Sequence, residues 1–236
     1  MYNEKRILAI IPARGGSKGL PRKNIRPLLG KPLLVWTIDV LKESGIVDRI
    51  FVSTDSDDVA AVARESGVEI PFLRNQFLAK DDSLVIDAVL EAIHFFRTSG
   101  EVYDLVMLME PTSPLRTSEM IVDCVRQMIT FGVGSVATFS ELEVPLERIW
   151  CVENEMASTY LKNDLAFKPR QSLTKAYKLN GLLYAIDVEV LCNMKHPQIM
   201  TQDVFPYITP REISTDIDDI NDFEYIDFLI RKRYDQ

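Results

Sequence analysis

The chain has 236 residues, of which 47% are hydrophobic and 26% are charged, and its formal net charge at pH 7 is -8. This length suits a single α/β domain spanning 1–236, and the acidic balance without a long basic stripe argues against nucleic acid or an anionic membrane as a partner. The apolar runs are far shorter than the roughly 20 residues of a membrane span, and Pro12 interrupts the first run, so we expect a cytoplasmic protein without a signal peptide.

Hydrophobic periodicity and turn residues predict an alternation of strands and helices. In chain order we expect a strand at 6–12, a helix at 32–44, a strand at 50–55, helices at 56–66 and 82–99, a strand at 104–110, a helix at 118–131, a strand at 134–140, a strand and a short helix within 180–191, and a helix at 219–234. Pro32 in a first helical turn, Ser56 and Ser118 as N-caps, and glycines directly after several helices support these boundaries. Such an alternation predicts right-handed crossovers and a mainly parallel sheet.

Residues 141–180 break this alternation, because they are polar and irregular and contain only weak strand signals. We interpret them as an excursion from the sheet. Trp150, Tyr160 and Phe167 lie within it.

The loop after the first predicted strand concentrates positive charge. From Lys5 to Ile38 the chain has no acidic residue and eight cations, namely Lys5, Arg6, Arg14, Lys18, Arg22, Lys23, Arg26 and Lys31. Glycines on this loop let backbone N–H groups approach an anion, and lysine and arginine neutralise it, which suits a triphosphate. On charge alone, a solvated basic loop is an equal alternative. The spacing matches neither the P-loop nor the dinucleotide-binding motif.

Five segments in order carry a resemblance to a known family. They are "IIPARGGSKGLPRKN" (10–24), "VSTDSDDVAAVARESGVEIPFLR" (52–74), "EPTSPLR" (110–116), "KPRQSLTKAYKLNGLLY" (168–184) and "STDIDDINDF" (214–223). The first resembles the signature loop of sugar nucleotidyltransferases that use CTP, and together the five are similar to the CMP-sialic acid synthetase (acylneuraminate cytidylyltransferase) family. Because they follow one another in the correct order along nearly the whole length of the chain, the match is more specific than any one motif.

The resemblance implies a fold and an activity. The fold is a three-layer, Rossmann-like nucleotidyltransferase fold with a mainly parallel mixed sheet and a dimerisation excursion at about 141–180. The activity is transfer of CMP from CTP to the anomeric hydroxyl of a nonulosonic acid (N-acetylneuraminic, legionaminic or related), which gives a CMP-sugar and pyrophosphate. The implied cofactor is Mg²⁺, for which Mn²⁺ can substitute, and the implied assembly is a homodimer.

The resemblance also assigns nucleotide-binding positions. On the loop these are Arg14, Gly15, Ser17, Lys18, Lys23 and Asn24. Arg74 matches an arginine that helps to read the cytosine, although Asn75 follows it where the family has proline, and a surface arginine is the alternative. A family serine near the base aligns with Val85, and Ser83 is the candidate substitute.

On the sugar side the resemblance assigns Glu110, Thr112, Ser113, Arg170, Lys178, Asn180 and Tyr184. Glu110 stands where the family usually has glutamine, so we expect a preference for a sialic acid analogue over N-acetylneuraminic acid. Arg170 suits the sugar carboxylate, because a guanidinium binds a carboxylate in a bidentate manner. A sugar-contacting lysine of some relatives aligns with Glu147. The alternative for "EPTSPLR" is a helix-entry turn, and the alternative for the segment around Arg170 is an interface loop.

Asp216 and Asp218 are the implied metal ligands, and with Arg14 and Lys23 they form the expected catalytic set. On an extended segment the two carboxylates point the same way, and Mg²⁺ takes one or two protein carboxylates together with phosphate oxygens. The alternative is an acidic cap on the last helix, a role that we expect of Asp219.

Other kinds of site are disfavoured. Cys124, Cys151 and Cys192 form no closely spaced pair, and His94 and His196 lie far apart in sequence, so we expect neither a disulfide framework nor a zinc site. Two readings of the whole chain stay open beside the main one. One is a cytidylyltransferase for the eight-carbon sugar acid Kdo, and the other is a nucleotide-binding regulator without turnover.

Overall fold

The computed structural model describes residues 1–16, 19–80 and 83–234, with the backbone alone at 234, and it contains the predicted alternation of strands and helices. The strands are β1 (Ile7–Pro12), β2 (Pro27–Leu28), β3 (Lys31–Pro32), β4 (Arg49–Ser53), β5 (Leu105–Leu108), β6 (Ser135–Glu141), β7 (Trp150–Glu153), β8 (Met156–Thr159), β9 (Tyr177–Asp187) and β10 (Phe205–Ile208). The helices are α1 (Leu33–Ser44), α2 (Asp57–Glu65), α3 (Val85–Thr98), α4 (Ser118–Phe131), α5 (Val188–Asn193) and α6 (Ile220–Tyr234). No helix in these described ranges is long and apolar enough to cross a membrane.

Six strands form the central sheet, in the order β10-β6-β9-β5-β1-β4. β1 is parallel to β4 and β5, and β10 is parallel to β6. β9 is antiparallel to both of its neighbours, β5 and β6. The expectation of a mainly parallel mixed sheet is therefore confirmed.

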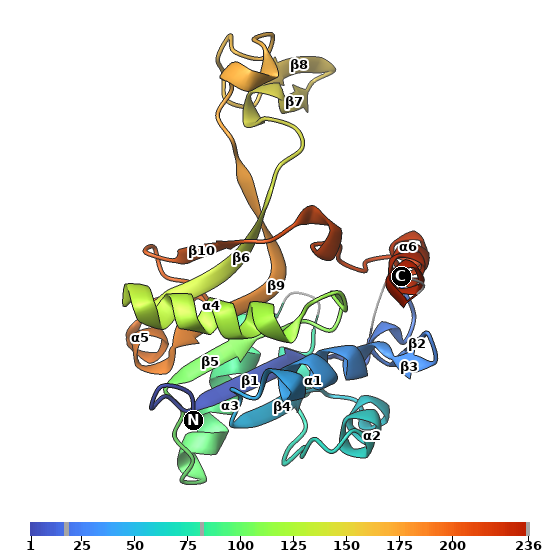
Figure 1. Cartoon of the computed structure of the whole chain (residues 1–236), viewed down its shortest axis with the longest axis vertical. Coiled ribbons are helices and arrows are strands. Elements are labelled where there is room, and N and C mark those ends of the chain that lie inside the picture. Colours follow the sequence, from blue (N-terminus) through green and yellow to red (C-terminus); the bar gives the residue numbers. More distant parts are fainter. Residues whose placement is uncertain (17–18, 81–82, 235–236) are drawn as a thin grey trace.

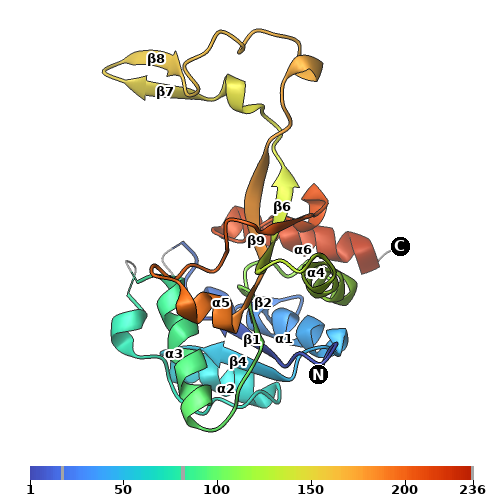
Figure 2. The same cartoon turned by 90° about the vertical axis from the view of Figure 1, so that its left-hand side faces the viewer.

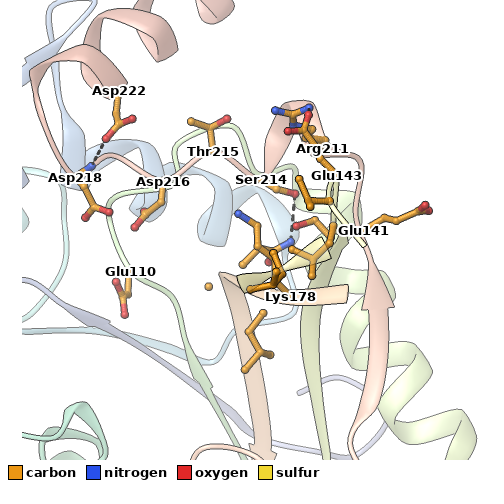
Figure 3. Close-up of a pocket in the computed structure, with 17 residues that line it drawn as sticks. Glu110, Glu141, Glu143, Lys178, Arg211, Ser214, Thr215, Asp216, Asp218 and Asp222 are labelled. Atoms are coloured by element: carbon orange, nitrogen blue, oxygen red, sulfur yellow. Dashed lines mark hydrogen bonds and ion pairs between the residues drawn. The ribbon is translucent and has the colours of Figure 1, made fainter. Parts of the chain in front are cut away.

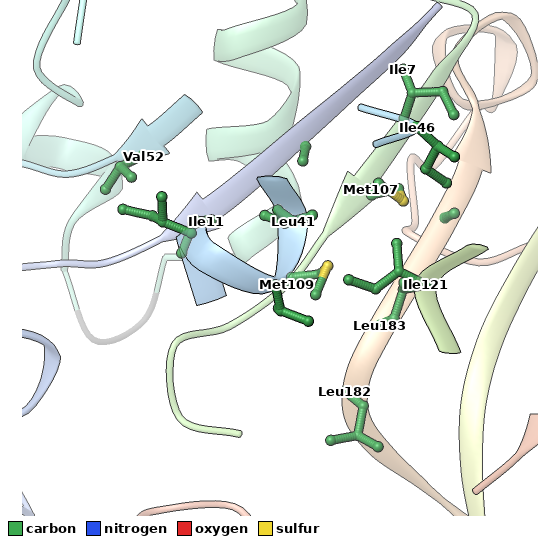
Figure 4. Close-up of a cluster of buried hydrophobic side chains, with 14 of the residues drawn as sticks. Ile7, Ile11, Leu41, Ile46, Val52, Met107, Met109, Ile121, Leu182 and Leu183 are labelled. Atoms are coloured by element: carbon green, nitrogen blue, oxygen red, sulfur yellow. The ribbon is translucent and has the colours of Figure 1, made fainter. Parts of the chain in front are cut away.

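Helices cover both faces of this sheet and give the expected three layers (Figure 1). On one face, α1, α2 and α4 pack on the sheet around Ile11, Leu41, Val52 and Ile121 (Figure 4). On the other face, α3 and α5 pack around a second cluster, which includes Phe96. These helices form because their apolar residues recur at helical spacing, and burying that face drives the packing. α6 belongs to a third cluster, with Leu28 of β2.

Two predicted helix starts can be compared with the structure. Ser56 is the N-cap of α2, and its side chain accepts a hydrogen bond from the backbone N–H of Val59. The cap of α4 is Thr117, whose side chain accepts from Met120, so the prediction of Ser118 was wrong by one residue. Both residue types make the same cap, because either hydroxyl reaches the orphan N–H groups of the first turn.

The chain between β6 and β9 forms an arm that projects away from the sheet (Figures 1 and 2). We define the arm as residues 142–176. β6 continues to Glu141 and pairs there with Tyr177 of β9, so the two strands lead the chain out of the sheet and back. The arm contains the hairpin β7–β8, which the sequence signalled only weakly. Several large apolar side chains on it are exposed, and Phe167 is 88% exposed.

Candidate functional site

Two side-chain hydrogen bonds hold the backbone of the loop after β1. Its backbone N–H at Gly15 donates to Oδ1 of Asp55 at 2.9 Å, and the Asn24 amide donates to the carbonyl oxygen of Arg14 at 2.9 Å. A Cβ on Gly15 would lie 2.7 Å from Cβ of Ser56, so the close approach to that segment needs glycine. The predicted residues Gly15 and Asn24 thus build the loop, whereas Ser17 and Lys18 lie outside the described residues.

A second segment, 214–219, packs against the turn that follows β5. The backbone N–H of Ile217 donates to the carbonyl oxygen of Thr112 at 3.0 Å, and the hydroxyl of Ser113 donates to Oδ1 of Asp216 at 3.3 Å. The turn residues predicted for the sugar and the aspartates predicted for the metal therefore belong to one bonded unit.

The loop after β1 also contacts this segment. Nζ of Lys23 donates to the carbonyl oxygen of Ile217 at 2.5 Å and lies 3.8 Å from Oδ1 of Asp218. A Cβ on Gly19 would lie 2.3 Å from the carbonyl oxygen of Asp218. The basic loop and the late aspartates, nearly 200 residues apart in sequence, are therefore direct neighbours.

Two cavities meet between these segments. The smaller has a volume of about 290 Å³ and is lined by Pro12, Arg14, Gly19, Lys23, Asn24, Glu110, Pro111, Thr112 and Asp218. The larger has a volume of about 820 Å³ and extends along the ends of β6 and β9. Glu110 and Asp218 line both cavities. We call the position of these two side chains the junction.

Acidic side chains outnumber basic ones in the wall of the larger cavity. Figure 3 shows Glu110, Asp216, Asp218 and Asp222 on one side and Glu141, Glu143, Lys178 and Arg211 on the other. Several of these groups are already paired within the protein. Glu141 accepts from Lys175 at 3.0 Å, Glu143 is paired with Arg211, and Asp222 accepts from the backbone N–H groups of Asp218 and Asp219.

Asp219 caps α6, as we expected from the sequence. Its Oδ1 accepts from the backbone N–H groups of Asn221 and Asp222, and these bonds lower its pKa. The capping role therefore falls to Asp219, which leaves the carboxylates of Asp216 and Asp218 in the cavity linings.

The backbone of Glu110 is bonded to a buried arginine, Arg116, which we did not predict as a site residue from the sequence. Arg116 donates to the carbonyl oxygen of Leu182 at 2.6 Å, to the hydroxyl of Thr37 at 2.9 Å, and to the backbone carbonyl of Glu110. Burial lowers the pKa of Arg116 to about 10, so it remains a cation at pH 7. Burial, followed by the charge of Asp216, raises the pKa of the Glu110 carboxyl. The motif "EPTSPLR" contained Arg116, but only the fold shows that it is buried.

The residues predicted to contact cytosine lie outside both cavity linings. Arg74 is buried at the end of β4, where its guanidinium donates to the hydroxyl and the carbonyl oxygen of Ser53 at 2.9 and 2.5 Å. Burial lowers the pKa of Arg74, the charge of Asp55 opposes this shift, and the charge of Arg14 adds to it. The Ser83 hydroxyl donates to the carbonyl oxygen of Phe77 at 2.9 Å.

The residues predicted for the sugar are only partly brought together. Lys178 and Asn180 line the larger cavity, and Tyr184, farther along β9, has its pKa raised by burial and by the charge of Glu110. Arg170 lies on the arm and lines a separate cavity of about 280 Å³. Glu147 is buried within the arm. Within one protomer, Arg170 is therefore not part of the junction.

The carboxylates of Asp216 and Asp218 suit a magnesium ion whose remaining ligands are water and substrate phosphates. Among the described residues, no group of three or more histidine, cysteine or acidic side chains could by itself hold a metal. Mg²⁺ is commonly bound by one or two carboxylates and completes its shell with water and substrate phosphates. Asp216 and Asp218, near the cavity that Arg14 and Lys23 help to line, fit that pattern.

Comparisons with known proteins agree on one family. A family model described as "Cytidylyltransferase" matches residues 8–227. The chain is 32% identical to a pseudaminic acid cytidylyltransferase of Campylobacter jejuni subsp. jejuni serotype O:23/36 over 97% of each chain. It is 39% identical to a CMP-N,N'-diacetyllegionaminic acid synthase of Legionella pneumophila over 76% of this chain and 77% of that protein. Among solved structures, a CMP:2-keto-3-deoxy-manno-octonic acid synthetase complexed with CTP has a TM-score of 0.70 and 16% identity, and it covers 97% of this chain and 99% of its own. This last likeness concerns the fold alone.

Proposed function

The chain belongs to the cytidylyltransferase family and is a nucleotidyltransferase, and from this premise we propose that it transfers CMP from CTP to the anomeric hydroxyl of a nonulosonic acid. The products are the CMP-sugar and pyrophosphate. The observation that carries the proposal is the junction, where a small cavity lined by Arg14 and Lys23 opens into a larger one at Glu110 and Asp218.

The smaller cavity suits the triphosphate of CTP. Arg14 and Lys23 supply positive charge to the phosphates, and fixed cations of this kind stabilise the charge that develops during phosphoryl transfer. Asp216 and Asp218 would hold Mg²⁺, which, when bound, neutralises charge on the pyrophosphate leaving group. Lys23 contacts the same segment, and its ammonium lies 3.8 Å from Oδ1 of Asp218.

The larger cavity suits the acceptor sugar. In this arrangement the α-phosphate lies at the junction and the anomeric oxygen attacks from the larger cavity. The bond between that oxygen and phosphorus forms, the bond to the β-phosphate breaks, and a junction carboxylate takes the hydroxyl proton. Lys178, which lies on the wall opposite Asp216 and Asp218, would bind the sugar carboxylate (Figure 3).

A second copy of the chain is part of the proposal. Arg170 lies on the arm, away from the junction of its own protomer, and the arm exposes large apolar side chains. A homodimer formed through the arm would cover these side chains, and it would let Arg170 pair with the sugar carboxylate in the other protomer.

A pyrophosphate-release assay tests the proposed reaction. The purified protein with Mg²⁺ is given CTP, ATP, GTP or UTP, together with N-acetylneuraminic, N,N'-diacetyllegionaminic or pseudaminic acid or Kdo. We expect release with CTP and a nine-carbon acid, and mass spectrometry should identify the CMP-sugar. Turnover with Kdo alone would favour the eight-carbon alternative. CTP binding without turnover on any acceptor would favour the regulator.

A further inference from the structure

Both N–H donors of the Asn180 side chain are engaged within the protein. Its Nδ2 donates to the hydroxyl of Thr209 at 2.7 Å and to the hydroxyl of Ser214 at 3.2 Å, and its Oδ1 accepts from the backbone N–H of Leu182 at 3.3 Å. A carboxamide has two N–H donors, and both are used here. An acceptor sugar in the larger cavity would have to displace one of these bonds to receive a hydrogen bond from Asn180.

The two hydroxyls that Asn180 binds are themselves connected. Thr209 is only 4% exposed, and both its backbone N–H and its hydroxyl bond to the carbonyl oxygen of Phe139. Oγ1 of Thr209 and Oγ of Ser214 are 2.9 Å apart, and Ser214 also donates to the carbonyl oxygen of Pro210 at 2.7 Å. Asn180, Thr209 and Ser214 thus form a three-residue cluster, which joins β9 to the chain that follows β10.

This cluster anchors the segment that carries Asp216 and Asp218. Asp216 is two residues beyond Ser214, and the next fixed point is Ile217, which bonds to the turn after β5. The segment is therefore held on one side by the cluster and on the other by Thr112 and Ser113. Figure 3 shows Ser214, Thr215 and Asp216 following the cavity wall towards Asp218.

We infer that Asn180 is a positioning residue, which holds the segment of Asp216 and Asp218 against β9 instead of contacting the acceptor. This inference rests on the proposed role of those aspartates in holding a divalent cation. Residues that orient metal ligands typically change metal affinity by about 10- to 100-fold when mutated. Because Thr209 and Ser214 belong to the same cluster, their loss should have the same consequence as the loss of Asn180.

Three variants separate positioning from acceptor contact, namely Asn180→Ala, Thr209→Val and Ser214→Ala. We expect each to weaken Mn²⁺ binding in the presence of CTP by about 10-fold, as measured by electron paramagnetic resonance without any acceptor. Amide hydrogen exchange of residues 212–219 should become faster in the metal-free protein. The KM for the acceptor should stay within about twofold while kcat falls, because removing a positioning group acts on the transition state.

The matched control is Ser172→Ala. Its hydroxyl donates to the carbonyl oxygen of Pro169 at 2.8 Å, much as Ser214 donates to Pro210, but it lies on the arm. We expect no change in Mn²⁺ affinity or in the exchange of 212–219. The double variant Asn180→Ala/Thr209→Val should bind Mn²⁺ no more weakly than the weaker-binding of the two single variants. The reason is that the effects of substitutions within one hydrogen-bond network are not additive.

Each other outcome has a definite meaning. If Asn180→Ala raises the acceptor KM while Mn²⁺ affinity and exchange stay at parental values, Asn180 contacts the acceptor and the inference is overturned. If the parent binds Mn²⁺ with CTP and the three variants bind it equally well, only the positioning role fails. If the parent binds no Mn²⁺ with CTP, the metal role of the aspartates fails with it. Should Asn180→Ala not fold, Ser214→Ala, which removes a single hydroxyl, decides the question.

Discussion

Glu110 lies at the junction, where burial and the charge of Asp216 raise its pKa. A raised carboxyl pKa means that the folded state binds this proton more tightly than the unfolded state does. Ionisation of Glu110 therefore destabilises the folded state. This free-energy cost is absent at a pH below the ordinary glutamate pKa and complete at a pH above the folded-state pKa. Replacing it with a neutral amide removes that cost.

We predict that Glu110→Gln raises the melting temperature at pH 8 and that this gain over the parent disappears as the pH falls to about 4, near the ordinary glutamate pKa. Thermal melts without metal or nucleotide measure it. Glu119→Gln is the control, and we expect it to lower the melting temperature at pH 8. Hydrogen bonding at the start of α4 lowers the pKa of Glu119, so its ionised form stabilises the folded state. A Glu110→Gln protein that is no more stable than the parent at pH 8 would contradict the prediction.

Motif resemblance named several residues that the fold brings together around the smaller cavity, but it could not show how they bond. Arg14, Lys23, Glu110 and Asp218 lie in quoted motifs, and the fold places all four around the smaller cavity. Their roles in binding stay predictions. Thr209 was missed because it lies outside those motifs, and its partners Phe139 and Asn180 are far away in sequence.

At the scale of elements, the contact between the loop after β1 and the segment 214–219 depends on glycine. A Cβ at Gly19 would lie 2.3 Å from a backbone oxygen of Asp218, whereas a Cβ at Gly16 meets nothing within 4 Å. Backbone cannot yield as a flexible side-chain end can, so the loop or the segment must shift. Positioning errors of about 1 Å can cost about 100-fold in rate.

We predict that Gly19→Ala lowers kcat/KM by about 100-fold, whereas Gly16→Ala on the same loop stays within about threefold of the parent. Steady-state pyrophosphate release measures both. Circular dichroism should show that both variants keep their secondary structure. Equal activity of the two variants would mean that the close approach at Gly19 does not matter for catalysis.

Helices were easier to predict than short strands, and β10 and the β7–β8 hairpin show the physical reasons. β10 contains Pro206, which lacks an N–H donor and so argues against a strand, but β10 is an edge strand and needs donors on one side only. The turn of the β7–β8 hairpin has Asn154 and Glu155 at φ of 50° and 65°. Glutamate is unusual in such a turn, so the typical Asn-Gly signal was absent.

For the whole molecule, the exposed apolar side chains of the arm lead to a prediction about assembly. Val152, Met156 and Phe167 are 72%, 73% and 88% exposed on the arm. An apolar surface of this kind on a projecting element is typical of an interface. We expect a homodimer at micromolar concentration by light scattering.

The variants Val152→Asp and Phe167→Asp should shift this dimer towards monomer, because a buried unpaired charge is unfavourable in an interface. Phe228→Asp is the control, since Phe228 is 59% exposed on α6, away from the arm (Figure 1). A parent protein that is monomeric at these concentrations, or a Phe228→Asp variant that dissociates as readily as the arm variants, would refute the arm as the interface.

The pairing of Glu141 with Tyr177 has a consequence for how this fold can diversify. The two ends of the arm are neighbours across a ladder, so everything between them can lengthen, shorten or be exchanged while the sheet keeps its register. Surface insertions whose ends already meet add little closure entropy. The arm can therefore change in length or sequence while the sheet keeps its register, so variation there could alter assembly and acceptor choice without disturbing the basic loop or the late aspartates.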